Sequence, residues 1–216
     1  MSTLPRSRTL PLFPLNTVLF PGGWLPLQIF ELRYLDMIQR AWREGTPFGV
    51  VALLEGREVQ RPAADNSGER FANEQFHAIG TLAEVRQLER PQPGLLRVMC
   101  QGTQRFRLQR PQRAGNGLWS ADVELLPADP VLEVPSDLEA TVLSLRAVLD
   151  ELQVAALQPA FVDDCAWVAH RWAELLPLAP SFKQQLLVTE SPLLRLELVA
   201  DVLDRLQQPG PDTPAA

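Results

Sequence analysis

The sequence predicts an α+β protein in which a β-rich part comes first and a helical part follows. Two observations lead to this fold class. Short apolar segments with turn residues between them fill the first part, and some alternate strictly, as Trp119, Ala121 and Val123 do. After Pro127 and Pro130 the apolar residues recur instead at steps of three and four, which is the period of a helix. With 216 residues, of which 46% are hydrophobic, the chain can bury a core without disulfides.

The β-rich part is expected to form a small barrel or sandwich over residues 1–130. A helix at 31–43, which ends at Gly45, is expected to pack against it through a face formed by Leu32, Leu35, Ile38 and Trp42, which recur at steps of three and four. A run of turn residues at 91–94 ends one strand, and a second turn at Gly102 is predicted to form a hairpin. The predicted strands are 47–54, 79–88, 96–100, 106–108 and 118–126.

The helical part is expected to be a bundle over residues 131–208, followed by a disordered tail at 209–216. Its first helix carries an apolar face from Leu138 to Leu152 and should end near Pro159. The last helix should begin at the Ser191-Pro192 pair, because serine caps a helix and proline suits its first position. The apolar stripe of the second predicted helix is Phe161, Cys165, Val168, Trp172 and Leu175.

The segment from Leu10 to Tyr34, LPLFPLNTVLFPGGWLPLQIFELRY, is the most distinctive part of the sequence. Its four prolines cannot donate to a strand ladder, so its strands should lie at edges or bulges. Such an edge could accept an extended peptide by strand addition. The alternative is that its aromatic side chains fill the core. The candidate peptide-binding residues are Phe20, Trp24, Phe30 and Tyr34.

This segment resembles the opening of the Lon protease N-terminal domain family, also called the Lon substrate-binding domain. Further similar segments are PFGVV at 47–51, IGTLA at 79–83 and GTQRFR at 102–107. The resemblance implies a PUA-like β-barrel followed by a helical bundle. It also implies a module that recognises other polypeptides, whether alone or as the accessory of a separate ATP-dependent protease.

Catalytic motifs are missing from the sequence. It has no P-loop motif, and its single lysine, Lys183, is expected to be a solvated surface residue. Cys165 and His170 could serve an enzyme, but five positions apart on a helix they turn to different faces. Two histidines and two cysteines spread along the chain predict no metal site, and no cofactor is expected. The protein is therefore not expected to be an enzyme.

Charge and composition leave one further alternative open. Residues 81–115 carry seven arginines against Glu84 and Glu89, so an RNA-binding barrel is the second hypothesis. The net charge of −6 makes nucleic acid a less favoured partner than unfolded or extended polypeptide segments. No apolar run is long enough to span a membrane, and no disulfide framework is indicated, so a cytoplasmic location is expected.

Overall fold

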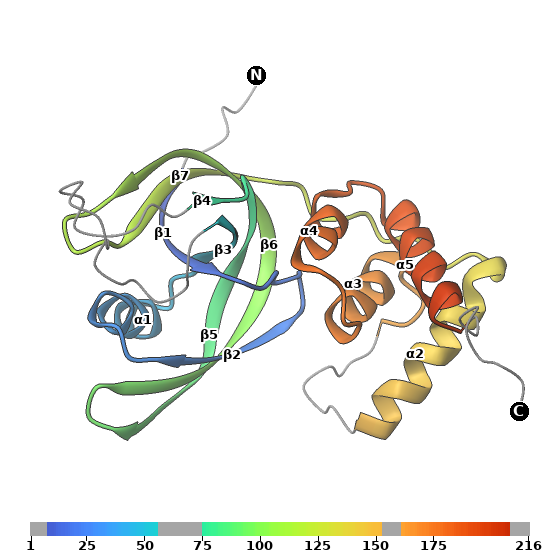
Figure 1. Cartoon of the computed structure of the whole chain (residues 1–216), viewed down its shortest axis with the longest axis horizontal. Coiled ribbons are helices and arrows are strands. Elements are labelled where there is room, and N and C mark those ends of the chain that lie inside the picture. The colour runs from blue at the N-terminus through green and yellow to red at the C-terminus, as the bar shows by residue number, and fades with distance from the viewer. Residues whose placement is uncertain (1–7, 56–74, 153–160, 208–216) are drawn as a thin grey trace, which may run out of the picture. The chain divides into compact units, whose positions relative to one another are not determined.

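The computed structural model describes residues 8–55, 75–152 and 161–207, and its contacts divide the chain into two compact units. Unit 1 extends to Ala128 and also includes Ala179–Leu187. Unit 2 comprises Asp129–Leu178 and the chain from Val188 onward. The helix end expected near Pro159 and the tail at 209–216 lie outside the described residues. Figure 1 labels the elements of both units.

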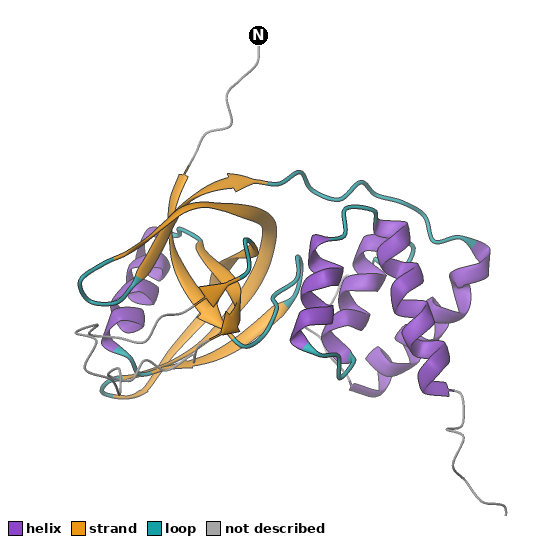
Figure 2. Cartoon of the chain, turned by 45° about the horizontal axis from the view of Figure 1, so that its top comes forward, coloured by secondary structure: helices purple, strands orange, loops and turns teal. Residues whose placement is uncertain are grey.

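Unit 1 contains a closed β-barrel, which confirms the predicted fold class. Five strands follow one another in the order β1-β7-β6-β5-β3, and a parallel pairing of β1 with β3 closes the ring (Figures 1 and 2). The other pairings of the ring are antiparallel. The seven strands are β1 Arg8–Leu15, β2 Trp24–Ile29, β3 Phe48–Glu55, β4 Gln75–Phe76, β5 Ile79–Gln92, β6 Leu95–Arg113 and β7 Trp119–Leu125.

The prolines of β1 and β2 lie at positions where their own strand pairs with another strand on one side. The first half of β1, with Pro11, pairs with β7, and the second half, with Pro14, pairs with β3. Strand β2, which holds Pro26, lies outside the ring and pairs with β6 alone among the described strands. This is the arrangement that a residue without an N–H requires.

The hairpin predicted at Gly102 is wrong, because β6 runs through this position as one strand from Leu95 to Arg113. The turn between β5 and β6 lies instead at Pro93-Gly94, where Gly94 has a φ of 79°. Gly102 is needed for a different reason. A Cβ atom there would lie 2.2 Å from the carbonyl oxygen of Phe20. The backbone N–H of Gly22 donates to Gly102, and that of Gly102 donates to Gly23, both at 2.8 Å.

Helix α1, Leu32–Glu44, packs against the barrel and ends at Gly45, whose φ is 61°. The expected buried face is only partly correct. Leu35 and Ile38 are buried, whereas Leu32 is 79% exposed and Trp42 is 44% exposed. The buried face of the helix is rotated about the helix axis relative to the predicted one. That face consists of Arg33, Tyr34, Leu35, Met37, Ile38 and Ala41.

Unit 2 is helical, with α2 at Glu139–Leu152 after a short 3-10 turn at Ser136–Leu138, α3 at Cys165–Leu175 and α5 at Pro192–Gln207. The Asp164 carboxylate caps α3 by accepting from the N–H of Trp167. The Ser191 hydroxyl accepts from the N–H of Leu194, which confirms the predicted start of the last helix. Cys165, Val168 and Trp172 are buried as expected, but Phe161 precedes the helix and is exposed.

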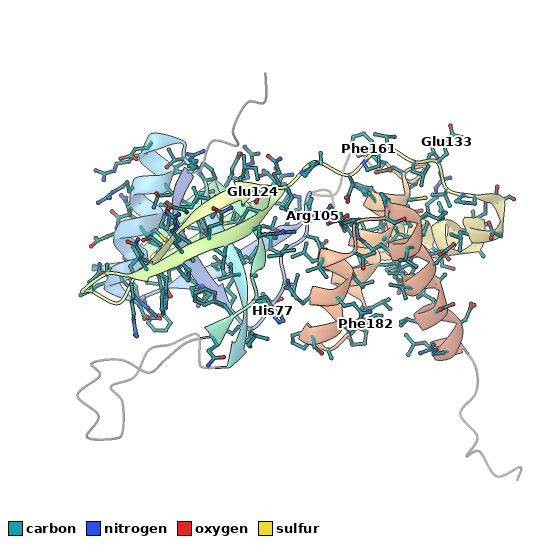
Figure 3. All side chains as sticks on the ribbon, turned by 90° about the horizontal axis from the view of Figure 1, so that it is seen from above. His77, Arg105, Glu124, Glu133, Phe161 and Phe182 are labelled. Carbon is teal, nitrogen blue, oxygen red and sulfur yellow. The ribbon has the colours of Figure 1, made fainter. Side chains whose placement is uncertain are left out.

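Helix α4, Pro180–Val188, packs on unit 1 although it lies between helices of unit 2 in the sequence. The Gln184 side-chain amide donates to the carbonyl of Ile79 in β5 at 2.9 Å. The buried Arg105 of β6 donates to the carbonyl of Leu187 at 2.9 Å (Figure 3). Helical periodicity alone does not show which unit a helix joins.

The helices that the structure describes include none with the length and apolar character of a membrane span.

Candidate functional site

Strand β2 and the start of α1 form a corner of unit 1 that carries three grooves. We call them the edge groove, the sheet groove and the hairpin groove, with volumes of about 240, 390 and 550 Å³. The edge groove is lined by Phe13, Leu15, Pro26–Glu31 and Tyr34. The sheet groove is lined by Pro26–Gln28, Gln87, Glu89 and Arg97–Met99. The hairpin groove is lined by Leu32, Leu35, Asp36, Gln39 and Arg90–Leu96.

The edge groove and the sheet groove share three residues of β2: Pro26, Leu27 and Gln28. Within the strand, Leu25, Leu27 and Ile29 belong to or pack on the core. Pro26 and Gln28 alternate with them and are exposed. Strand β6 is the one described strand that pairs with β2. We call the opposite side of β2, with which no described strand pairs, its open edge.

A partly buried ion pair lies at the corner where β2 passes into α1. The Nε atom of Arg33 lies 3.0 Å from Oε2 of Glu31, and Nη1 of Arg33 donates to the carbonyl of Gly117 at 2.6 Å. Arg33 is only 6% exposed. A charged hydrogen bond of this kind, shielded from water, holds its backbone firmly. Arg33 thus connects the start of α1 to Gly117, just before β7.

Phe30, the first residue of this corner, has a side chain that is 57% exposed. Leu32, two residues on, is 79% exposed, so the corner presents two large apolar side chains on either side of Glu31. Phe30 lines the edge groove and Leu32 lines the hairpin groove. Large exposed apolar side chains gathered beside grooves are typical of interaction sites.

The four candidate residues fall into different environments. Tyr34 is 2% exposed and stacks on Phe13 with ring centroids 4.1 Å apart, yet it lines the edge groove. Phe20 is fully buried. Trp24 is half-buried at the first position of β2 and lines none of the three grooves. The structure thus brings Phe30 and Tyr34 together at the edge groove.

Sequence reasoning missed Pro26, Leu27, Gln28 and Leu32 as groove residues. Leu32 was assigned to the buried face of the helix. The sequence did contain a signal for the β2 residues. Pro26 predicts an edge strand, and the residues of an edge strand can contact a bound peptide.

The arginines of the basic segment 81–115 lie in different environments. Five of the seven are exposed, namely Arg86, Arg90, Arg97, Arg107 and Arg110. Arg105 is buried, and the guanidinium of Arg113 lies 5.4 Å from the ring centroid of Trp119. Arg86 pairs with Glu84 at 2.8 Å. In the sheet groove, Arg97 lies opposite Glu89 in the strand register, so the groove presents both signs of charge.

Cys165 and His170 occupy buried structural positions in unit 2. The thiol of Cys165 lies 3.4 Å from the carbonyl oxygen of Glu133, and burial raises its pKa. The Nε2 atom of His170 lies 3.8 Å from the Asp129 carboxylate, which also accepts from Arg195 at 2.7 Å. Across the described ranges, no group of three or more His, Cys, Asp or Glu side chains could hold a metal ion.

The family model that matches the chain is described as the ATP-dependent protease La (LON) substrate-binding domain, and it covers residues 9–205. A Lon protease of Paraburkholderia phytofirmans is 31% identical over 94% of this chain and 25% of its own length. A Lon protease of Anaeromyxobacter dehalogenans is 28% identical over 82% of this chain and 17% of its own length. The chain thus spans a quarter or less of these two relatives.

Solved structures show the same fold. A crystal structure described as a Lon N-terminal domain protein from Xanthomonas campestris has a TM-score of 0.72 and 31% identity, and the match covers 90% of this chain and 98% of that one. The N-terminal domain of the Lon protease of the Mycobacterium avium complex has a TM-score of 0.60 at 18% identity and covers 90% of this chain and 97% of that one.

Proposed function

This chain belongs to the Lon substrate-binding domain family, and we propose that it binds extended, apolar segments of other polypeptides at the open edge of β2. One observation carries the proposal. The open edge of β2 lies between two grooves that share Pro26, Leu27 and Gln28, and the exposed Phe30 stands at its end.

An extended peptide suits this site because successive side chains of a strand point to opposite faces. A strand added to β2 would place alternate side chains toward the edge groove and toward the sheet groove, while its backbone meets the open edge. Phe30 would supply the aromatic anchor, with Tyr34 in the floor of the edge groove. Trp24, at the other end of β2, would contact the ligand there, and Phe20 would support the strand from the core.

The arginines of residues 81–115 favour a polypeptide over RNA as the partner. Arg105 is buried, Arg113 lies over the ring of Trp119 and Arg86 pairs with Glu84, which leaves fewer of the seven for phosphate contacts. We propose a cytoplasmic, non-catalytic role, in which an ATP-dependent protease is the partner that receives the bound polypeptides.

The experiment compares Phe30→Ala with Trp42→Ala in binding to a reduced, carboxymethylated and therefore unfolded protein. Both aromatic residues are partly exposed, at 57% and 44%, but Trp42 lines none of the three grooves, which makes it the matched control. We expect Phe30→Ala to raise the Kd about tenfold or more, as for a typical aromatic hot spot, and Trp42→Ala to leave it within about twofold. Equal affinities for the two variants would refute the site.

A further inference from the structure

Unit 2 has a groove of its own, with a volume of about 410 Å³, between the first turns of α2 and two segments that precede α2 and α3. We call it the α2 groove. It is lined by Glu133, Val134, Glu139, Val142, Leu143, Arg146, Val162 and Asp163. All of these residues belong to unit 2, so the groove is complete within one unit.

The backbone beside the groove is held by a short antiparallel bridge between Glu133 and Asp164. The N–H of Val134 donates to the carbonyl of Asp163 at 3.1 Å, and that of Cys165 donates to Leu132 at 2.8 Å. The carboxylate of Asp164 accepts from the N–H of Leu132 at 3.2 Å. The two segments therefore form one fixed wall, and α2 forms the other.

Apolar side chains remain exposed at this groove. Val142 is buried in its floor, but Leu143, the next residue, is 63% exposed and lines the groove. Phe161, one residue before Val162 of the lining, is 59% exposed (Figure 3). Burying such side chains against a partner would be favourable, at about 25 cal/mol per Å² of apolar surface.

The charge at the α2 groove favours a partner that carries positive charge. Glu133, Glu139 and Asp163 are exposed carboxylates, and the one arginine of the lining, Arg146, lies 3.7 Å from Asp163.

The rest of unit 2 is acidic as well, because its described residues include thirteen aspartates and glutamates but four arginines, two of them buried. Arg171 is 1% exposed and pairs with Glu174, and Arg195 is fully buried and pairs with Asp129. The accessible surface is therefore acidic, and it attracts cations over a distance of about 10 Å at moderate salt.

We propose that the α2 groove is a docking site for a short amphipathic segment of a partner protein, in which lysines or arginines flank apolar side chains. The apolar side chains enter between Val142 and Leu143, and the cations meet Glu133 and Glu139. This site is separate from the β2 edge and does not depend on the function proposed for it.

The test uses the full chain and a synthetic peptide, KLLKKLLKKLLK, with ELLEELLEELLE as the control of opposite charge. Binding is measured by calorimetry at low salt for three variants. The first, Glu133→Gln with Glu139→Gln, neutralises the groove. The second, Asp201→Asn with Asp204→Asn, removes two exposed carboxylates of α5 and is the matched control. The third, Leu143→Asn, removes the exposed apolar contact.

We expect the groove variant to raise the Kd of the basic peptide about fivefold and Leu143→Asn about tenfold, with the α5 variant within about twofold of the unaltered chain. Circular dichroism confirms that each variant is folded. Equal weakening by the groove and α5 variants would show that the peptide responds only to overall charge. That result, an unchanged affinity of Leu143→Asn, or equal binding of the acidic peptide would each overturn the proposal.

Discussion

Phe30 and Tyr34 show how neighbouring aromatic residues of one apolar segment take opposite roles. Tyr34 is 2% exposed and stacks on Phe13, whereas Phe30 is 57% exposed at the edge groove. Residue type does not separate them, because both are aromatic residues of the same strand-to-helix segment. What separates them is the direction of the chain at the corner, where Glu31 and Arg33 form a partly buried ion pair. Sequence reasoning could find the group of candidates but not the accessible member.

Gly102 is the residue at which we expect the smallest chemical change to have a large effect on stability. An alanine Cβ would meet the Phe20 carbonyl oxygen at 2.2 Å, and backbone cannot swing away as a side-chain end can. We expect Gly102→Ala to lower the free energy of unfolding by about 1–3 kcal/mol in urea titrations. Gly115→Ala, where nothing lies within 4 Å of the new Cβ, should change it by less than about 1 kcal/mol. Equal stability of the two variants would contradict the close approach at Gly102.

Cys100 links stability to pH through its burial in the barrel core. Burial raises the pKa of its thiol from 9.0 to about 12. The unfolded chain therefore releases the thiol proton at a lower pH than the folded chain. The contribution of Cys100 to the free energy of unfolding is present below pH 9 and is lost as the pH rises from 9 toward 12.

The comparison with Cys100→Ala isolates this effect from other titrating groups. Between pH 8 and pH 10, the free energy of unfolding of the unaltered chain should fall by about 1 kcal/mol more than that of Cys100→Ala. Urea titrations at both pH values measure it. If the two proteins differ in free energy of unfolding by the same amount at both pH values, the thiol is not desolvated.

Among the elements, β2 is the one on which the proposed function rests, and a peptide can test its pairing directly. In a strand, alternate residues turn their N–H and C=O groups to the same edge. Of two sets of alternate residues in a bound peptide, only one would therefore donate to β2. N-methylation removes these donors without changing the side chains.

We predict that the extended peptide KTVTFTVTK binds the chain. We also predict that N-methylation of its two sets of alternate residues has different effects on binding. Methylation of one set should weaken binding about tenfold or more, and methylation of the other set should leave it within about threefold. Fluorescence anisotropy of labelled peptides measures both. Equal affinities of the two methylated peptides would rule out strand addition.

Element types were predictable from periodicity, but their partners were less so. The strand alternation at 119–125 and the proline-marked edge at Pro26 carried enough signal. The hairpin at Gly102 was wrong because a glycine that permits a close backbone approach resembles a turn glycine in sequence. The packing of α4 on unit 1 includes hydrogen bonds of Gln184 and Arg105, and such polar side chains give no signal in an apolar pattern.

At the scale of the whole molecule, charge separates the two units more clearly than any motif does. Unit 1 has mixed charge, with arginines opposite carboxylates at Arg97 and Glu89, whereas the accessible surface of unit 2 is acidic. An unfolded polypeptide with added carboxylates should therefore avoid unit 2, because like charges repel. Binding of such a probe would therefore report on unit 1.

Site-specific photo-crosslinking tests the central claim, that extended polypeptides bind along β2. A photoreactive phenylalanine analogue is placed at one of three exposed positions: Gln28 in β2, Glu44 at the end of α1 or Asp204 in α5. Each chain is irradiated with the reduced, carboxymethylated protein. We predict crosslinks at position 28 and background levels at positions 44 and 204. Crosslinking that is equal at all three positions, or stronger at 44 or 204 than at 28, would contradict the proposed binding site.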